Sequence, residues 1–144
     1  MQKRAAEAFS GEGAYLYGGR WNHPGTRVVY VSDSLALAAL EQFVHLGRAA
    51  MRLRFVSFRV EIPESVAMDG LDRSSLPKNW RQEPPPDRTK DMGTAWARRG
   101  TATVLKVPSV FVPVEYNFVL NPAHPDFKTI VVRDPQPFGF DPRM

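Results

Sequence analysis

The chain has 144 residues, of which 43% are hydrophobic and 11% aromatic, enough for one compact core. We therefore expect a single domain over residues 1–144. It has no cysteine, which excludes disulfides, thiolate nucleophiles and cysteine-ligated metals. No apolar stretch reaches the roughly 20 residues of a membrane span, and no apolar signal-peptide block begins the chain, so a cytoplasmic protein without membrane contact is expected.

The net charge of +4 and the isoelectric point of about 9.7 favour an anionic partner. Because the basic residues are scattered along the chain, direct nucleic-acid binding is not expected. A non-catalytic basic module that binds nucleic acid or an acidic protein stays open as the lowest-ranked alternative.

The first part of the chain predicts a loop, a strand and a helix. Glycine and aromatic residues crowd residues Phe9–Gly25, which suits a shaped loop. The β-branched run Thr26–Val31 predicts a buried strand. The helix that follows ends at Gly47. Its candidate caps are Ser32, Asp33 and Ser34, and its apolar side consists of Leu35, Leu37, Leu40, Val44 and Leu46.

The remainder predicts mainly strands. Alternation over Arg52–Ile62 indicates a strand whose phase changes between Phe55 and Val56, as at a β-bulge. The proline-rich segment Leu71–Lys90 predicts an irregular excursion. A short helix at about Thr89–Arg99 and its terminal Gly100 precede three expected strands: Thr101–Val107, Tyr116–Leu120 and Thr129–Arg133.

This order predicts an α+β fold, a compact single domain with a mostly antiparallel β core flanked by a few short helices.

Known nucleotide and metal motifs are absent from the sequence. Gly11 and Gly13 begin a G-x-G-x-x-G pattern that fails at Leu16, and there is no P-loop and no H-E-x-x-H. The three histidines are far apart, so no metal centre is expected.

Two charged residues are the first candidates for a site. Glu41 falls at the edge of the apolar stripe of its predicted helix, where a carboxylate is partly desolvated. It is either a boundary residue that reaches water or a carboxylate held in a cleft. Arg20 follows Gly18-Gly19, where close backbone approach and a guanidinium suit a diphosphate. Its alternative is stacking on Trp21 or Tyr17 for loop structure alone.

Two further residues have both a structural and a functional interpretation, and a third has a structural one. Tyr30 is either a core tyrosine or an aromatic face for a nicotinamide or adenine ring. Ser109, just after a strand, either forms a turn or donates a hydrogen bond to a carboxylate or a ribose. Asn117 has the character of an Asx-type turn residue.

The chain resembles the RES-domain family, named for an Arg, a Glu and a Ser. The likeness runs from about Ala8 to Phe127. It rests on Phe9-Ser10-Gly11-Glu12-Gly13-Ala14, Gly18-Gly19-Arg20-Trp21-Asn22, Gly25 with Val28-Val29-Tyr30, Leu35 to Glu41, Leu105-Lys106-Val107-Pro108-Ser109, and Asn117 through Asn121-Pro122-Ala123-His124-Pro125-Asp126-Phe127. Family members commonly begin with a further strand that carries a Trp-Arg pair, whereas this chain starts close to the Phe9 motif, which leads us to expect a trimmed start or an absent strand.

The resemblance implies an ADP-ribosyltransferase-like fold and a toxin of a type II toxin–antitoxin system with NAD as substrate and no metal. The expected reaction is cleavage of the nicotinamide–ribose bond by a glycohydrolase or phosphorylase, and the alternative is a protein ADP-ribosyltransferase acting on a specific cellular enzyme. The expected catalytic residues are Glu41, Arg20, Tyr30 and Ser109, and the expected NAD contacts are Gly19, Arg20, Trp21, Tyr30 and Asn117. The implied partner is a helix-turn-helix antitoxin that blocks the cleft, and a homodimer within the complex stays open.

Overall fold

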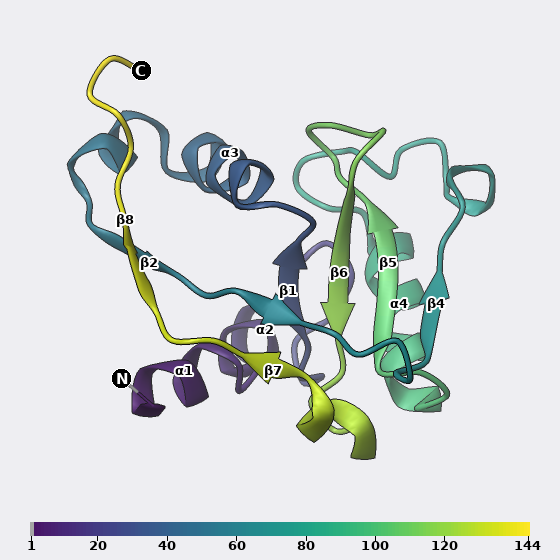
Figure 1. Cartoon of the computed structure of the whole chain (residues 1–144). Helices are drawn as coiled ribbons and strands as arrows, with labels where there is room; N and C mark the ends of the chain where they lie inside the picture. The colour runs from purple at the N-terminus through teal and green to yellow at the C-terminus, as the bar shows by residue number, and fades with distance from the viewer. Residues whose placement is uncertain (1) are drawn as a thin grey trace.

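The computed structural model describes residues 2–144, with side chains described from residue 5 onward. It is a mixed helix and strand structure, so the predicted α+β class is confirmed (Figure 1). The α-helices are α1 (Gln2–Ala8), α2 (Glu12–Tyr17), α3 (Leu35–Leu46) and α4 (Asp87–Arg99), and the 3-10 helices are η1 (Gly47–Arg52), η2 (Arg73–Ser75) and η3 (Pro125–Thr129). Among the described residues, no helix combines the length and the apolar character that crossing a membrane requires.

A central sheet of four strands has the order β1-β6-β5-β4. Its members are β1 (Val29–Ser32), β4 (Met68–Gly70), β5 (Val104–Pro108) and β6 (Tyr116–Leu120). All neighbours in it are antiparallel except β4 and β5, which are parallel. Two ribbons flank the sheet: β2 (Phe55–Ser57) pairs with β8 (Gln136–Phe138), and β3 (Val60–Glu61) pairs with β7 (Val131–Val132). The mostly antiparallel core is therefore as predicted.

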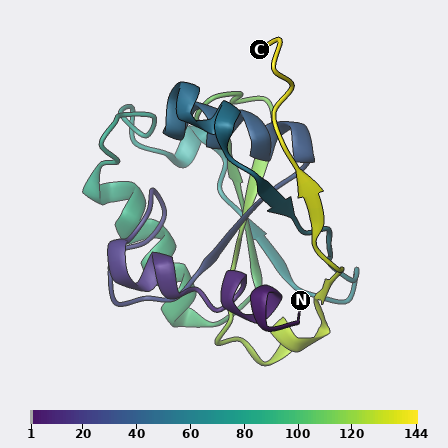
Figure 2. The ribbon, with the colours of Figure 1, turned by 90° about the vertical axis from the view of Figure 1, so that its left-hand side faces the viewer.

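The central sheet has an apolar core on each face, because successive strand residues point to opposite sides. Val107 and Val119 belong to the cluster that contains Trp21 and Trp96, the latter on α4. Val104 and Leu120 belong to a second cluster. Figure 2 shows α4 on one side of the sheet and β8 on the other.

Helix α3 has the boundaries that its capping residues predict. The Ser34 hydroxyl accepts a hydrogen bond from the backbone N–H of Leu37, and Gly47 ends the helix with φ 64°. The predicted apolar side packs only in part, since Leu37 is buried whereas Leu35 and Val44 are 52% and 49% exposed. The apolar contacts of α3 are therefore concentrated at Leu37 and at Phe43, whose ring lies 5.6 Å from that of Phe140 between centroids.

The prediction of a loop over Phe9–Gly25 is wrong for residues 12–17, which form α2. Gly11, with φ 77°, and Gly18, with φ 73°, adopt the positive φ values that glycine permits at the two ends of this helix. The residues between them are compatible with a helix. The predicted strand Thr26–Val31 begins later, at Val29.

The single strand predicted over Arg52–Ile62 is also wrong. Its start belongs to η1, and its remainder divides into β2 and β3, with the break at Phe58–Arg59 rather than between Phe55 and Val56. The division follows from pairing with two different strands, β8 and β7. Neither β4 nor β8 was predicted, because each has three residues and depends on its partner strand.

The other predictions hold within a few residues. The irregular excursion ends at Pro86, α4 starts at Asp87, and Gly100 has the left-handed conformation. The strand Tyr116–Leu120 has the predicted bounds. The strands predicted at Thr101–Val107 and Thr129–Arg133 are found at Val104–Pro108 and Val131–Val132.

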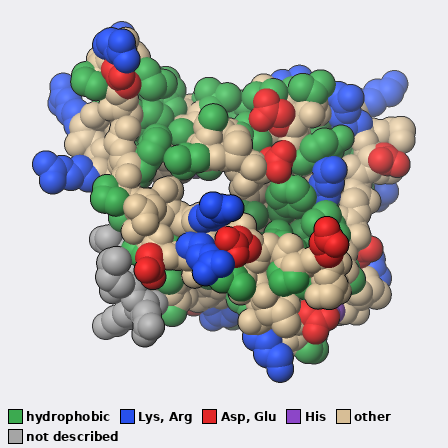
Figure 3. Space-filling view, viewed as in Figure 1, with side chains coloured by type: hydrophobic (Ala, Val, Ile, Leu, Met, Phe, Trp, Pro, Cys, Tyr) green, Lys and Arg blue, Asp and Glu red, His purple; other side chains and the backbone are tan. Residues whose placement is uncertain are grey.

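A large hollow separates β1 from the β2–β8 ribbon. Its volume is about 1460 Å³, and Leu35, Ala38, Ala39 and Gln42 of α3 line it together with all four residues of β1. Figure 3 shows this hollow in the face of the molecule, with basic side chains at its edge. Tyr30 of β1, a residue of the site described below, lines this hollow, whereas Glu41 of α3 does not.

Gly93 allows α4 to lie against the backbone of Trp21. A Cβ atom there would lie 1.8 Å from the Trp21 carbonyl oxygen. We expect Gly93→Ala to lower the free energy of unfolding by about 3 kcal/mol, because the backbone must move apart. Urea unfolding measures this change.

The matched control is Gly13→Ala in α2, where an added Cβ would meet no described atom within 4 Å. Alanine there should stabilise the chain by up to about 1 kcal/mol. Equal losses in the two variants would contradict the close contact at Gly93.

Candidate functional site

The carboxylate of Glu41 is the centre of the site. Its Oε2 atom accepts a hydrogen bond from the Ser109 hydroxyl at 3.1 Å and another from Nδ2 of Asn117 at 2.8 Å. The side chains come from α3, from the residue after β5 and from β6. No hydrogen bond to Oε1 is found among the described residues. One carboxylate oxygen is therefore fixed, while the other stays available.

Ser109 has a hydroxyl whose orientation is set by its surroundings. The residue is fully buried, and its Oγ accepts hydrogen bonds from the backbone N–H groups of Phe111 and Val112, both at 3.2 Å. Because these N–H groups occupy its acceptor capacity, the hydroxyl hydrogen is directed to Glu41. Ser109 thus both closes its own turn and positions the carboxylate.

Tyr30 on β1 connects the sheet to the glycine-rich segment. Its hydroxyl donates to Oδ1 of the fully buried Asn22 and accepts from the Trp21 N–H at 3.1 Å. Gly19 lies directly against the ring, since a Cβ there would be 2.7 Å from the hydroxyl oxygen. Burial raises the pKa of Tyr30 far above its ordinary value, which the Trp21 N–H and the charge of Arg20 offset only in part.

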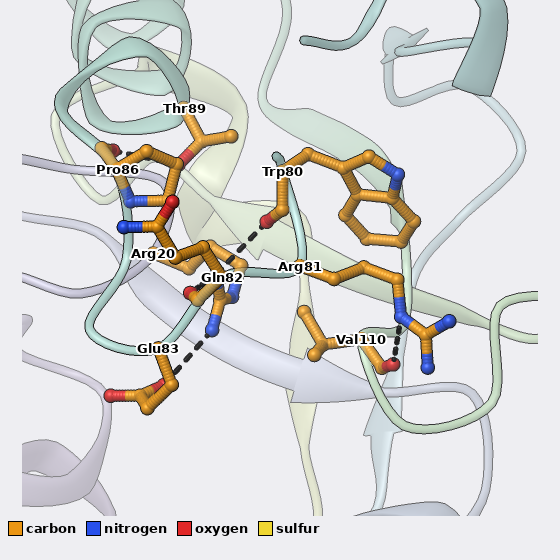
Figure 4. Close-up of polar contacts among 8 residues, drawn as sticks. All are labelled: Arg20, Trp80, Arg81, Gln82, Glu83, Pro86, Thr89 and Val110. Atoms are coloured by element: carbon orange, nitrogen blue, oxygen red, sulfur yellow. Dashed lines mark hydrogen bonds and ion pairs between the residues drawn. The ribbon is translucent and has the colours of Figure 1, made fainter. Parts of the chain in front are cut away.

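Arg20 fastens the loop that precedes α4. Its Nη1 atom donates to the carbonyl oxygens of Trp80 at 2.9 Å and Gln82 at 2.8 Å, and its Nη2 atom donates to Oε2 of Glu83 at 3.1 Å (Figure 4). Burial lowers the pKa of Arg20, an effect that Glu83 opposes and that Tyr30 and Glu41 oppose further. The guanidinium is thus partly engaged by the protein itself.

The same loop is tied to the Ser109 side of the site. The Nε atom of Arg81 donates to the carbonyl oxygen of Val110 at 2.8 Å, and the hydroxyl of Thr89 donates to the Pro86 carbonyl at 3.0 Å (Figure 4). The segment Trp80–Pro86 therefore spans the distance between Arg20 and the turn that contains Ser109.

The structure brings most of the predicted site residues together. Glu41, Ser109 and Asn117 are hydrogen-bonded, and Arg20 lies close enough to Tyr30 and Glu41 for their charges to affect its pKa. Trp21 is different, because the residue is 3% exposed and belongs to the core. The contact of Trp21 with NAD stays a prediction.

Two residues at the site were missed by sequence reasoning. Asn22 holds the Tyr30 hydroxyl, and its Nδ2 group donates to the carbonyls of Ala14, His23 and Thr26. The sequence signal that could have identified Asn22 is its position just before the Pro24-Gly25 turn. Glu83 precedes three consecutive prolines, and no local pattern indicates its contact with Arg20. In the described part of the chain, no group of three or more His, Asp or Glu side chains could hold a metal ion.

The fold and the site together define a mixed α/β protein that holds a carboxylate at the end of a sheet, near an arginine and a tyrosine. A family model described as the RES domain matches residues 1–141. The chain belongs to the RES domain family.

Named relatives extend over nearly the whole chain. It is 41% identical over 145 residues to "Toxin Res" of Yersinia enterocolitica, covering 100% of this chain and 95% of that protein. It is 40% identical over 141 residues to "Prs ADP-ribosylating toxin" of Sphingobium sp., covering 96% and 88%. The crystal structure of the M. tuberculosis MbcT–MbcA toxin–antitoxin complex contains a chain with a TM-score of 0.68 at 18% identity, covering 92% of this chain and 77% of that one. The last similarity shows the fold alone.

The Tyr30 hydroxyl gives the chain a pH-dependent stability. Because folding raises this pKa, the unfolded state loses the proton first as the pH rises above about 10, and the free energy of unfolding should fall there by up to about 1.4 kcal/mol per pH unit. Tyr30→Phe should lower stability at pH 7 by about 1–3 kcal/mol, since the Trp21 N–H and Asn22 Oδ1 lose their partner. The variant should also lack this decline above pH 10.

Urea unfolding at pH 7, 10 and 11 measures both effects. Tyr17→Phe is the matched control, because Tyr17 is 80% exposed and its loss should change neither quantity. Parallel pH curves for the wild type and Tyr30→Phe would contradict the role of the buried hydroxyl.

Proposed function

We propose that this chain is the toxin of a type II toxin–antitoxin system and that it cleaves NAD at the nicotinamide–ribose bond, which would deplete cellular NAD. Membership of the RES domain family and the toxin names of its relatives support the first part. The observation that carries the second is the carboxylate of Glu41, fixed through one oxygen by Ser109 and Asn117. A fixed anion is the group that this reaction needs most.

The chemistry explains that requirement. When the bond between C1′ and the nicotinamide nitrogen breaks, its electron pair leaves with nicotinamide, which becomes neutral. Positive charge then develops on the ribose in an oxocarbenium-like transition state, and a preorganised carboxylate stabilises it. Because the leaving group is already cationic before cleavage, no strong general acid is required.

The remaining residues would bind and orient NAD. Arg20 would hold the diphosphate through its guanidinium, since the backbone N–H groups of Gly19 and Trp21 already donate within the chain. Tyr30 would pack on the nicotinamide side through the exposed part of its ring, as the residue is 38% exposed. Ser109 would keep Glu41 directed at the ribose. The reaction proposed here uses no metal.

The acceptor of the ADP-ribose decides the type of enzyme. Water gives a glycohydrolase and phosphate a phosphorylase; in each case a C1′–O bond forms and the acceptor loses a proton. A protein side chain as acceptor gives a transferase. This second candidate is favoured by the Sphingobium relative, whose name describes it as an ADP-ribosylating toxin of Prs.

The proposed partner is an antitoxin of the helix-turn-helix class that blocks the cleft between Arg20 and Glu41. The similar M. tuberculosis fold comes from a toxin–antitoxin complex, which supports an antitoxin partner. Within such a complex, a homodimer of this chain is also proposed.

Glu41→Gln tests the reaction. The substitution preserves shape and removes the charge, so nicotinamide release from NAD should fall about 100-fold or more. Release is measured with and without phosphate, which separates phosphorolysis from hydrolysis. Labelled NAD with a cell lysate tests for transfer to a protein.

Glu64→Gln is the matched control, because it removes the same charge from an exposed position and should leave the rate unchanged. Absence of nicotinamide release and of protein labelling by the wild type would contradict an enzymatic function. Anion binding that both variants strengthen equally would instead support the basic binding module.

Glu83→Gln tests the role of Arg20. Glu83 is an anion already seated on the guanidinium, with its side chain 73% exposed, and it should compete with the substrate diphosphate. An exposed ion pair contributes about 0.2–1 kcal/mol, so its removal should lower KM for NAD by up to about fivefold at unchanged kcat.

Glu12→Gln, which breaks the exposed pair with Arg27, is the control and should not alter KM. An unchanged or increased KM in Glu83→Gln would show that Arg20 does not bind the diphosphate at this position.

A further inference from the structure

Asn117 has a hydrogen-bonding arrangement that the fold alone does not explain. Its Nδ2 donates to Oε2 of Glu41 at 2.8 Å, while its Oδ1 is buried and, among the described residues, without a hydrogen-bond partner. Exchange of the two amide atoms would turn the oxygen toward the carboxylate, which is repulsive. The amide is therefore fixed in the orientation that serves Glu41 and leaves its own oxygen unpaired.

A buried acceptor without a partner destabilises a protein, and native structures rarely keep one without a functional reason. Asn117 lies on β6, between Ser32 of β1 and Val107 of β5 in the register of the sheet. Neither neighbour requires an amide at this position. An apolar strand residue would remove the unpaired oxygen and keep the backbone pairing.

Ser109 provides the contrast. It donates to the same Oε2 atom, but its hydroxyl also satisfies the buried backbone N–H groups of Phe111 and Val112. Loss of Ser109 therefore removes support from Glu41 and from its own turn. Loss of Asn117 removes support from Glu41 alone.

We propose that Asn117 is a positioning residue for Glu41, retained for its N–H donor at the expense of fold stability. This inference rests on the proposed function, because it assigns the effect of Asn117 to the step that Glu41 assists. Asn117 acts through the carboxylate of Glu41. NAD binding requires no contact between Asn117 and the ribose. Its contribution is to kcat and not to the affinity for NAD.

The test compares Asn117→Leu and Asn117→Val with Ser109→Ala and the wild type, each assayed for nicotinamide release and thermal unfolding. Both Asn117 variants should lose about 10- to 100-fold in kcat, with KM for NAD within about twofold and Tm equal to or above that of the wild type. Valine is included because it is smaller than leucine and favours strands. Ser109→Ala should lose kcat and Tm together.

Each other result overturns the inference. An increased KM at unchanged kcat would make Asn117 a substrate-binding residue, and an unchanged kcat would remove its role altogether. A fall in Tm with both variants would make it structural. If the wild type releases no nicotinamide, the proposed function fails and this inference with it; if the wild type is active and the Asn117 variants match it, only the inference fails.

Discussion

The two hydrogen bonds that reach Oε2 of Glu41 join α3 to the end of the central sheet. The helix itself packs through the buried Leu37 and through Phe43, whose ring contacts Phe140, while the bonds from Ser109 and Asn117 fix the carboxylate of Glu41. They connect three elements that are distant along the chain. The geometry of the carboxylate consequently depends on contacts between elements that only the fold brings together.

A second polar centre organises the opposite side of the site. Arg20 binds two backbone carbonyls and one carboxylate of the segment Trp80–Glu83, and Arg81 ties that segment to Val110. A proline-rich segment without regular structure is thereby held in one conformation. One acceptor of Arg20 is an exposed carboxylate, and in the proposed function the substrate diphosphate would take its place while the two carbonyls keep the loop.

The glycine-rich segment before β1 owes its composition to close packing as much as to any ligand. Gly19 leaves room for the ring of Tyr30, and Asn22 receives the Tyr30 hydroxyl. The backbone of Trp21 lies against Gly93 of α4. Residues that a sequence comparison associates with a ligand site thus include several whose contacts are internal. Arg20, by contrast, presents a charged group, and Tyr30 presents a partly exposed ring.

The sequence by itself determined the features that local interactions set. Ser34 and Gly47 define α3, Gly100 ends α4, and the β-branched and aromatic residues of Tyr116–Leu120 define β6, since caps and strand preferences act over a few residues. Local patterns marked Arg20, Tyr30, Glu41 and Ser109 as candidates, whereas the family and the catalytic roles of these residues followed from a resemblance of motifs.

Only the tertiary structure decided which of these groups meet. Ser109 and Asn117 are 68 and 76 residues from Glu41, and Glu83 is 63 residues from Arg20. No local pattern encodes such contacts, because they depend on how the sheet places its strand ends. The same reason explains why β4 and β8 escaped prediction and why Arg52–Ile62 divides in two: short strands take their form from the partner they pair with.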